Sequence, residues 1–161
     1  PARPGFRTAV DSVRKRGSIF GGNKPKGGLF VKYLLVDDDE SIHLYLKDIL
    51  EPFAATDSAL DGARAIELFE HSLAPGGEPY DAVFLDILMP GMDGHAVAAR
   101  LRELERGREN GGEFKLIMIT ALSDTRNLSK AFFKGFASCY IVKPFEREAV
   151  LNELRVNKII P

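Results

Sequence analysis

Residues 84–94 have the sequence FLDILMPGMDG, and this stretch carries the pattern that decides the fold. It begins inside an apolar run over 80–85, which predicts a buried strand that ends at Asp86. Proline and glycine then interrupt the chain, and apolar residues at helical spacing, Val97 and Leu101 among them, predict a helix over 94–106. The stretch therefore predicts a strand, a loop and a helix in succession, with a carboxylate where the strand ends.

The same alternation of strand and helix extends in both directions along the chain. The other predicted strands cover 31–36, 53–56, 114–119 and 138–142, and the other predicted helices cover 41–51, 61–72, 124–134 and 146–158. Most strands are apolar throughout rather than alternating, which is typical of a parallel sheet covered on both faces. The sequence predicts an α/β domain: a doubly wound, five-stranded parallel sheet with five helices.

The composition of the 161 residues excludes several classes of protein. Hydrophobic residues make up 45% and charged residues 28%, as in ordinary globular domains. Cys139 is the only cysteine, so the chain has no internal disulfide and no cysteine-rich zinc module. Its apolar runs are shorter than a membrane span. We expect a cytoplasmic protein that makes no membrane contact.

Residues 1–30 differ in character from the rest. They hold seven Lys or Arg side chains against Asp11 alone, together with three prolines and six glycines, whereas the remaining residues carry 15 basic and 22 acidic side chains. This composition is typical of a linker or tail. We expect 1–30 to be a poorly ordered basic leader and the domain to cover 31–158.

Polar or charged residues follow four of the five predicted strands: Asp37, Asp38 and Asp39, then Asp86, then Thr120, then Lys143. In doubly wound sheets the carboxyl ends of the strands form the binding crevice. Clustered carboxylates repel one another, and Mg²⁺ relieves this repulsion. A carboxylate can also attack phosphorus, while an ammonium and a hydroxyl stabilise the transferred group.

Each of these residues has an ordinary structural explanation when it is taken alone. An aspartate after a strand commonly caps the next helix, as Asp39 would, and a lone lysine is commonly solvated. A threonine at a strand end is simply a good β former. Four such features at successive strand ends favour a functional site instead.

Four stretches together resemble the response-regulator receiver domain of two-component signalling. They are LVDDDE at 35–40, FLDILMPGMDG at 84–94, ITA at 119–121 and YIVKPF at 140–145. The resemblance covers about 31–158 and implies the flavodoxin-like receiver fold. The run from Asp86 to Gly94 is its most specific part.

The resemblance implies a role for each matching residue. Asp86 would be the phospho-acceptor, and Mg²⁺ would be the cofactor. The metal would be held by Asp37, Asp38, Asp86 and the backbone carbonyl of Leu88. Lys143, with a cis bond to Pro144, would pair with the phosphoryl group.

Two further residues would report the phosphorylated state. Thr120 would be the switch hydroxyl that moves towards the phosphoryl group, and Tyr140 would be the aromatic switch that follows it. Tyr140 has an equally good alternative as a half-buried side chain that only packs. Leu88 and Leu122, two positions after Asp86 and Thr120, are apolar and cannot orient an attacking water, so we expect slow dephosphorylation.

The resemblance also implies partners. The phosphoryl donor would be a sensor histidine kinase or a phosphotransfer protein, and a downstream output protein or domain would bind the surface formed by 124–158. A homodimer through that surface is a further expectation, and direct nucleic-acid binding is not expected. The protein would be a signalling switch that takes part in its own phosphorylation, not an enzyme acting on an external metabolite.

Two alternatives remain open from the sequence. Asp37 and Asp39 have the spacing of a haloacid-dehalogenase-like phosphohydrolase, but that interpretation leaves Asp86 and its loop unexplained. A degenerate receiver that only binds proteins would lack part of the acid, threonine and lysine set, which is complete here. The histidines His43, His71 and His95 are expected to be exposed on helices.

Overall fold

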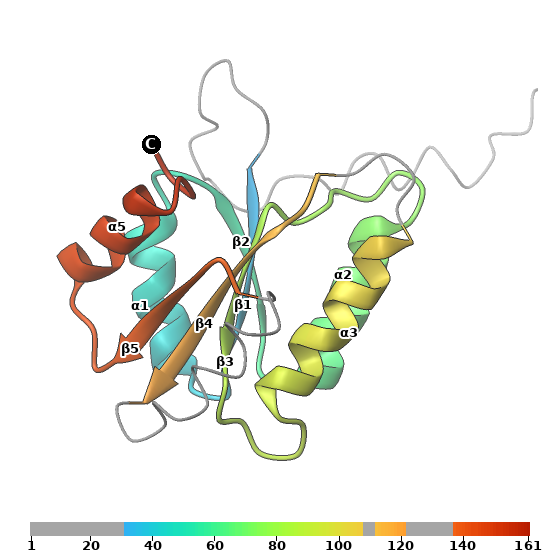
Figure 1. Ribbon diagram of the computed structural model, residues 1–161, viewed down its shortest axis with the longest axis horizontal. Helices are drawn as coiled ribbons and strands as arrows, with labels where there is room; N and C mark the ends of the chain where they lie inside the picture. The colour runs from blue at the N-terminus through green and yellow to red at the C-terminus, as the bar shows by residue number, and fades with distance from the viewer. Residues whose placement is uncertain (1–30, 108–111, 122–136) are drawn as a thin grey trace, which may run out of the picture.

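The computed structural model describes residues 31–107, 112–121 and 137–161 of the chain. Five parallel strands form one sheet in the order β2-β1-β3-β4-β5 (Figure 1). The strands are β1 (Lys32–Val36), β2 (Ala55–Ala59), β3 (Ala82–Asp86), β4 (Lys115–Ala121) and β5 (Cys139–Lys143). The predicted five-stranded parallel sheet is therefore confirmed.

Helices cover both faces of this sheet. They are α1 (Glu40–Leu50), α2 (Gly62–Leu73), α3 (Gly94–Arg106) and α5 (Arg147–Val156). The first and last lie on one face, and α2 and α3 lie side by side on the other (Figure 1). These four are the helices of the described residues, whereas the helix predicted over 124–134 and the leader over 1–30 lie outside them.

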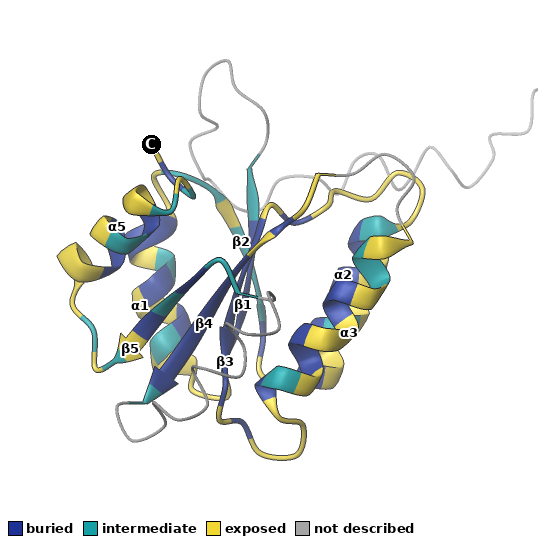
Figure 2. Ribbon diagram, viewed as in Figure 1, coloured by how far each residue is buried: buried dark blue, intermediate teal, exposed yellow. Residues whose placement is uncertain are grey.

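The core has two halves because successive side chains of a strand point to opposite faces. Leu34 and Val36 of β1 pack with the helix pair α2 and α3. Tyr33 and Leu35 of the same strand pack with α1 and α5. Strand β3 is buried throughout and β1 and β4 are buried except at their ends, while the outer faces of the helices are exposed (Figure 2). This explains why the strands read as continuous apolar runs.

The second strand begins and ends later than predicted. The sequence pattern predicts a strand over 53–56, but β2 covers Ala55–Ala59. Its residues read ATDSA, and most of them are partly or fully exposed because β2 is an edge strand. An apolar run marks a strand buried on both faces, so it misses a polar edge strand. The other predicted strands differ from the observed ones by one or two residues at their ends.

The strand order places the site. Strand β1 lies between β2 and β3, so the chain runs outward to one side of β1 before it continues on the other. In such sheets the crevice opens where the order reverses, beyond the carboxyl ends of the strands. Asp37 follows β1 and Asp86 ends β3 at that position.

Candidate functional site

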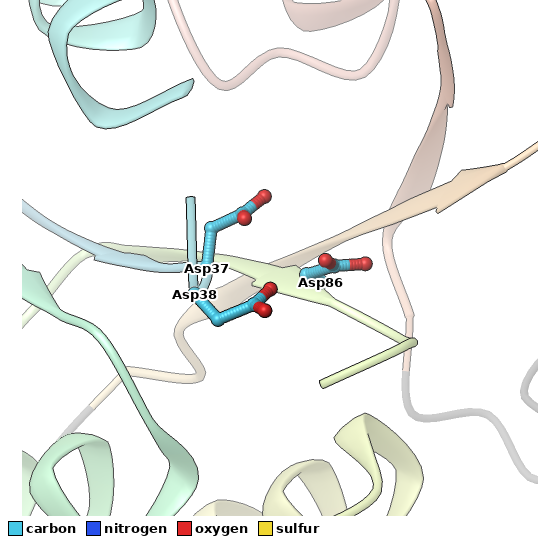
Figure 3. A group of neighbouring side chains, drawn as sticks. All are labelled: Asp37, Asp38 and Asp86. Carbon is cyan, nitrogen blue, oxygen red and sulfur yellow. The ribbon is translucent and has the colours of Figure 1, made fainter. Parts of the chain in front are cut away.

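Three carboxylates meet at the carboxyl ends of β1 and β3. One oxygen from each of Asp37, Asp38 and Asp86 lies within 4.8 Å of the other two (Figure 3). Asp37 and Asp86 are buried, whereas Asp38 is exposed. Such a group of oxygen ligands, partly open to water, suits a hard divalent cation such as Mg²⁺. The residues present therefore fit the cofactor that the sequence predicted.

Lys143 joins two of these carboxylates. Its Nζ donates to Asp37 Oδ2 at 2.8 Å and to Asp86 Oδ2 at 3.1 Å. Burial of Lys143 favours its neutral form, but Asp37 and Asp86 outweigh burial, so the pKa of Lys143 is raised. A charged ammonium is thus held at the end of β5, next to the predicted phospho-acceptor.

Asp86 occupies an environment that disfavours its charge. It is 4% exposed. Burial, with a smaller contribution from Asp37, raises the pKa of the Asp86 carboxyl, and Lys143 only partly opposes this. The backbone N–H of Leu88 donates to Asp86 Oδ1 at 3.1 Å. One carboxylate oxygen is therefore fixed by the loop after β3, and the other contacts Lys143.

Thr120 lies at the same end of the sheet. In the ladder between β3 and β4, Asp86 pairs with Ile119, so Thr120 is one residue further along. Its side chain is fully buried, and Oγ1 donates to the Ala121 carbonyl at 3.2 Å. The peptide bond from Lys143 to Pro144 is cis, as expected.

Tyr140 is half-buried on β5. It packs against the core cluster on the side of α2 and α3. Burial raises the pKa of its hydroxyl. This placement agrees with both roles that the sequence left open, the aromatic switch and simple packing.

Asp39 does not join the other carboxylates. Its Oδ1 accepts from the backbone N–H of Ser41 at 2.8 Å and from Ser41 Oγ at 2.6 Å, so it caps α1. These hydrogen bonds lower the pKa of Asp39. Capping a helix is the ordinary structural role that the sequence offered for Asp39.

His43 is buried on α1, so the prediction that it is exposed is wrong. His71 is exposed, and His95 is half-buried, but His43 is only 4% exposed. Its Nε2 lies 2.6 Å from the backbone oxygen of Asp37. Helical spacing could have found this, because His43 shares the buried face of α1 with Leu46 and Leu50.

A model of the response regulator receiver domain matches residues 33–155. The chain belongs to the response regulator receiver family. Two chemotaxis proteins named CheY are similar to this receiver. The one from Treponema pallidum is 33% identical over 135 residues, which cover 83% of this chain and 85% of that protein. The one from Halobacterium salinarum is 33% identical over 122 residues, covering 75% and 91%.

Other relatives contain a receiver within a longer chain. The hybrid signal transduction histidine kinase L of Dictyostelium discoideum is 33% identical over 127 residues, which cover 76% of this receiver and 7% of the kinase. Receivers of two-component systems act as signalling switches, not as enzymes in the ordinary sense.

Solved structures agree on the fold. CheY4 from Vibrio cholerae has a TM-score of 0.63 at 24% identity, covering 79% of this receiver and 98% of that chain. A CheY-like receiver from Methanospirillum hungatei has a TM-score of 0.65 at 24% identity, covering 79% and 92%. Within the described residues, no helix of this receiver has the length and apolar character needed to span a membrane.

Proposed function

We propose that this receiver accepts a phosphoryl group on Asp86 and thereby changes a surface that contacts other proteins. The observation that carries the proposal is the site itself. Three carboxylates lie within 4.8 Å of one another, and the Lys143 ammonium bridges the two buried ones. This arrangement combines a nucleophile, ligands for a cation and a fixed positive charge.

Asp37, Asp38 and Asp86, with the backbone carbonyl of Leu88, would hold Mg²⁺. When it is bound, the cation supplies positive charge that relieves the repulsion between the carboxylates and stabilises the oxygens of the transferred group. The exposed Asp38 leaves this side of the site open to water and to the phosphoryl donor.

The reaction is a transfer from phosphohistidine to carboxylate. An oxygen of Asp86 attacks phosphorus and forms an acyl phosphate, while the phosphorus–nitrogen bond of the donor breaks and the imidazole leaves with its electron pair. Lys143, now 3.1 Å from Asp86, pairs with a phosphoryl oxygen. Thr120 would donate its hydroxyl to another phosphoryl oxygen, and Tyr140 would follow its movement.

The partners in this proposal are proteins. The donor would be a sensor histidine kinase or a phosphotransfer protein, and similarity to receivers within hybrid histidine kinases supports this. An output protein, or a second copy of the chain, would bind the surface over 124–158, of which 137–158 lie in the described part. We place the receiver at 31–158 of a cytoplasmic protein, with 1–30 as its leader or linker.

The test is the intact mass of the protein after incubation with Mg²⁺ and acetyl phosphate. We expect one phosphoryl adduct in the wild type, none without Mg²⁺ and none in Asp86→Asn. Asp39→Asn is the matched control, because asparagine still caps α1, and it should form the adduct.

Two other outcomes would overturn the proposal. An adduct that survives Asp86→Asn but is lost in Asp37→Asn would indicate the phosphohydrolase alternative. No adduct in a folded wild type, with acetyl phosphate or with a phosphorylated histidine phosphotransfer domain, would indicate a module that works without phosphorylation.

A further inference from the structure

His43 contacts the backbone of Asp37, one of the three clustered aspartates. Its Nε2 is 2.6 Å from the carbonyl oxygen of Asp37, and the imidazole is buried. A carbonyl oxygen has no proton to donate, so Nε2 must carry the hydrogen of this bond. Its other nitrogen, Nδ1, is buried and has no hydrogen-bond partner among the described residues. The Asp37 carbonyl is thus the polar contact that accounts for a histidine at this core position.

Every polar group of Asp37 has a hydrogen-bond partner. Its N–H donates to the Ala59 carbonyl at 3.2 Å, and its Oδ1 accepts from the Asp39 N–H at 2.9 Å. Its Oδ2 accepts from Lys143 at 2.8 Å. The carbonyl lies beyond the last ladder pair of β1 with β3, Val36 with Leu85, and His43 is its partner there.

The Asp38 side chain, in contrast, has no such partners in the part of the chain that the structure describes. Its carboxylate is exposed, and within 31–107, 112–121 and 137–161 no hydrogen bond or ion pair to another side chain fixes it. The point and direction in which its side chain leaves the backbone depend on the peptide that joins it to Asp37. The Asp37 carbonyl belongs to that same planar peptide, so a bond to this oxygen sets the orientation of the plane. The hydrogen bond from His43 consequently acts on Asp38.

We infer that His43 is a positioning residue for the cation site: its Nε2–H holds the Asp37–Asp38 peptide so that the Asp38 carboxylate meets those of Asp37 and Asp86. This inference rests on the proposed function, because the cation matters here as the partner of phosphorylation. Removing an outer hydrogen bond of this kind commonly weakens metal binding by about tenfold or more.

The experiment compares His43→Leu with His43→Gln in the full 161-residue chain. Leucine fills a similar apolar space without a donor, whereas the glutamine amide can offer an N–H near the position of Nε2. Binding of Mg²⁺ alone is followed by NMR titration of backbone amides at one fixed pH. Leu46→Ala is the matched control, because Leu46 lies on the same buried face of α1 and has no polar group.

We expect the dissociation constant for Mg²⁺ to rise about tenfold in His43→Leu and to return to within about threefold of wild type in His43→Gln. Leu46→Ala should lower thermal stability and leave the constant unchanged. With acetyl phosphate, His43→Leu should need more Mg²⁺ for half-maximal phosphorylation, yet reach a near wild-type rate at saturation. A general loss of structure would lower the rate at every Mg²⁺ concentration.

The inference is overturned if a folded His43→Leu binds Mg²⁺ like the wild type, or if the leucine and glutamine variants are weakened equally. If His43→Leu does not fold, His43→Asn takes its place, because the shorter amide keeps the polarity but does not reach the carbonyl. Failure of the proposed function would look different: the wild type would form no adduct on Asp86, whatever the Mg²⁺ titrations of the variants show.

Discussion

Asp86, the proposed phospho-acceptor, lies at a buried position where a negative charge is costly. Burial is the main reason that its pKa is raised, and Asp37 adds to the effect. For an acid with a raised pKa, folding favours the protonated form. Stability is therefore lost as pH rises from the usual pKa of the carboxyl through its higher value in the folded state. Above that pH range the ionised Asp86 works against folding.

Asp86→Asn should therefore stabilise the receiver when Mg²⁺ is absent. Asparagine keeps an oxygen for the N–H of Leu88 and removes the buried charge. We expect Tm at neutral pH to rise by about 3 °C, with the difference closing towards about pH 4. Thermal unfolding followed by circular dichroism measures this. The control Asp93→Asn, in which asparagine still caps α3, should stay near the wild type, and an equal or lower Tm for Asp86→Asn would contradict the argument.

Leu88 occupies a position that we expect to affect hydrolysis of the proposed acyl phosphate. Its side chain is 55% exposed, two residues after Asp86, and has no group that could orient a water molecule. Leu122, the other position named for this role, lies outside the described residues. We expect the phosphorylated protein to last minutes or longer and Leu88→Asn to shorten that time several-fold. A mass-spectrometric time course after removal of acetyl phosphate measures the lifetime of the adduct in both proteins. Decay of the wild-type adduct within seconds would contradict the expected slow dephosphorylation.

At the scale of elements, the loop between β3 and α3 brings the start of α3 against the backbone of Asp86, the proposed phospho-acceptor. Gly94 opens α3, and its N–H donates to the Ile87 carbonyl at 3.0 Å. A Cβ on Gly94 would fall on the carbonyl oxygen of Asp86 and within 2.7 Å of Ile87 Cα. The absence of a side chain lets α3 begin this close to the site.

Gly94→Ala should consequently disturb the backbone at Asp86. We expect a loss of about 2 kcal/mol in the free energy of unfolding and slower phosphorylation by acetyl phosphate. Urea unfolding and the rate of adduct formation measure the two effects. Gly112→Ala is the matched control, since a Cβ there meets nothing within 4 Å. If Gly94→Ala and Gly112→Ala had the same free energy of unfolding and the same phosphorylation rate, the contact between a Cβ at Gly94 and the Asp86 backbone would be relieved without cost.

At the scale of the whole molecule, partly buried hydrogen bonds join segments far apart in the chain at both ends of the sheet. Lys143 ties β5 to Asp37 and Asp86 at the carboxyl end. At the opposite end, the Tyr33 hydroxyl donates to the Ile159 carbonyl at 3.0 Å, which joins β1 to the segment after α5. Burial, with a smaller effect of Asp81, raises the pKa of Tyr33 to about 12.

Alkaline conditions should therefore destabilise the whole domain. The neutral Tyr33 is favoured in the folded state, so its contribution is lost as pH rises from about 10 towards 12. The buried thiol of Cys139, whose pKa is raised to about 12, acts in the same direction. We expect the Tm of the wild type to fall above about pH 9. The Tm of Tyr33→Phe should fall less steeply, although this variant should be less stable by about 1 kcal/mol at pH 7, because it lacks the hydroxyl that donates to Ile159. A flat Tm up to pH 11 would contradict this.

Much of the fold was predictable from the sequence because local patterns report local structure. Continuous apolar runs marked the central strands, and helical spacing marked α1, α2, α3 and α5. Since the carboxyl ends of parallel strands share one edge of a sheet, the aspartates that follow β1, the aspartate that ends β3 and the lysine that ends β5 could be predicted to converge. The motif from Asp86 to Gly94 then predicted the receiver family, which the comparison confirmed.

The tertiary structure decided where individual side chains go. Asp38 and Asp39 are neighbours in a run of three aspartates, yet Asp38 lies with the carboxylates of Asp37 and Asp86 and Asp39 caps a helix. The polar β2 is a strand because β1 pairs with it, and His43 is buried because the Asp37 carbonyl accepts its hydrogen. These outcomes depend on partners distant in the chain or on the direction of a backbone bond. Residue type and spacing determine which elements form, whereas packing and hydrogen bonding between the elements determine what each side chain can do.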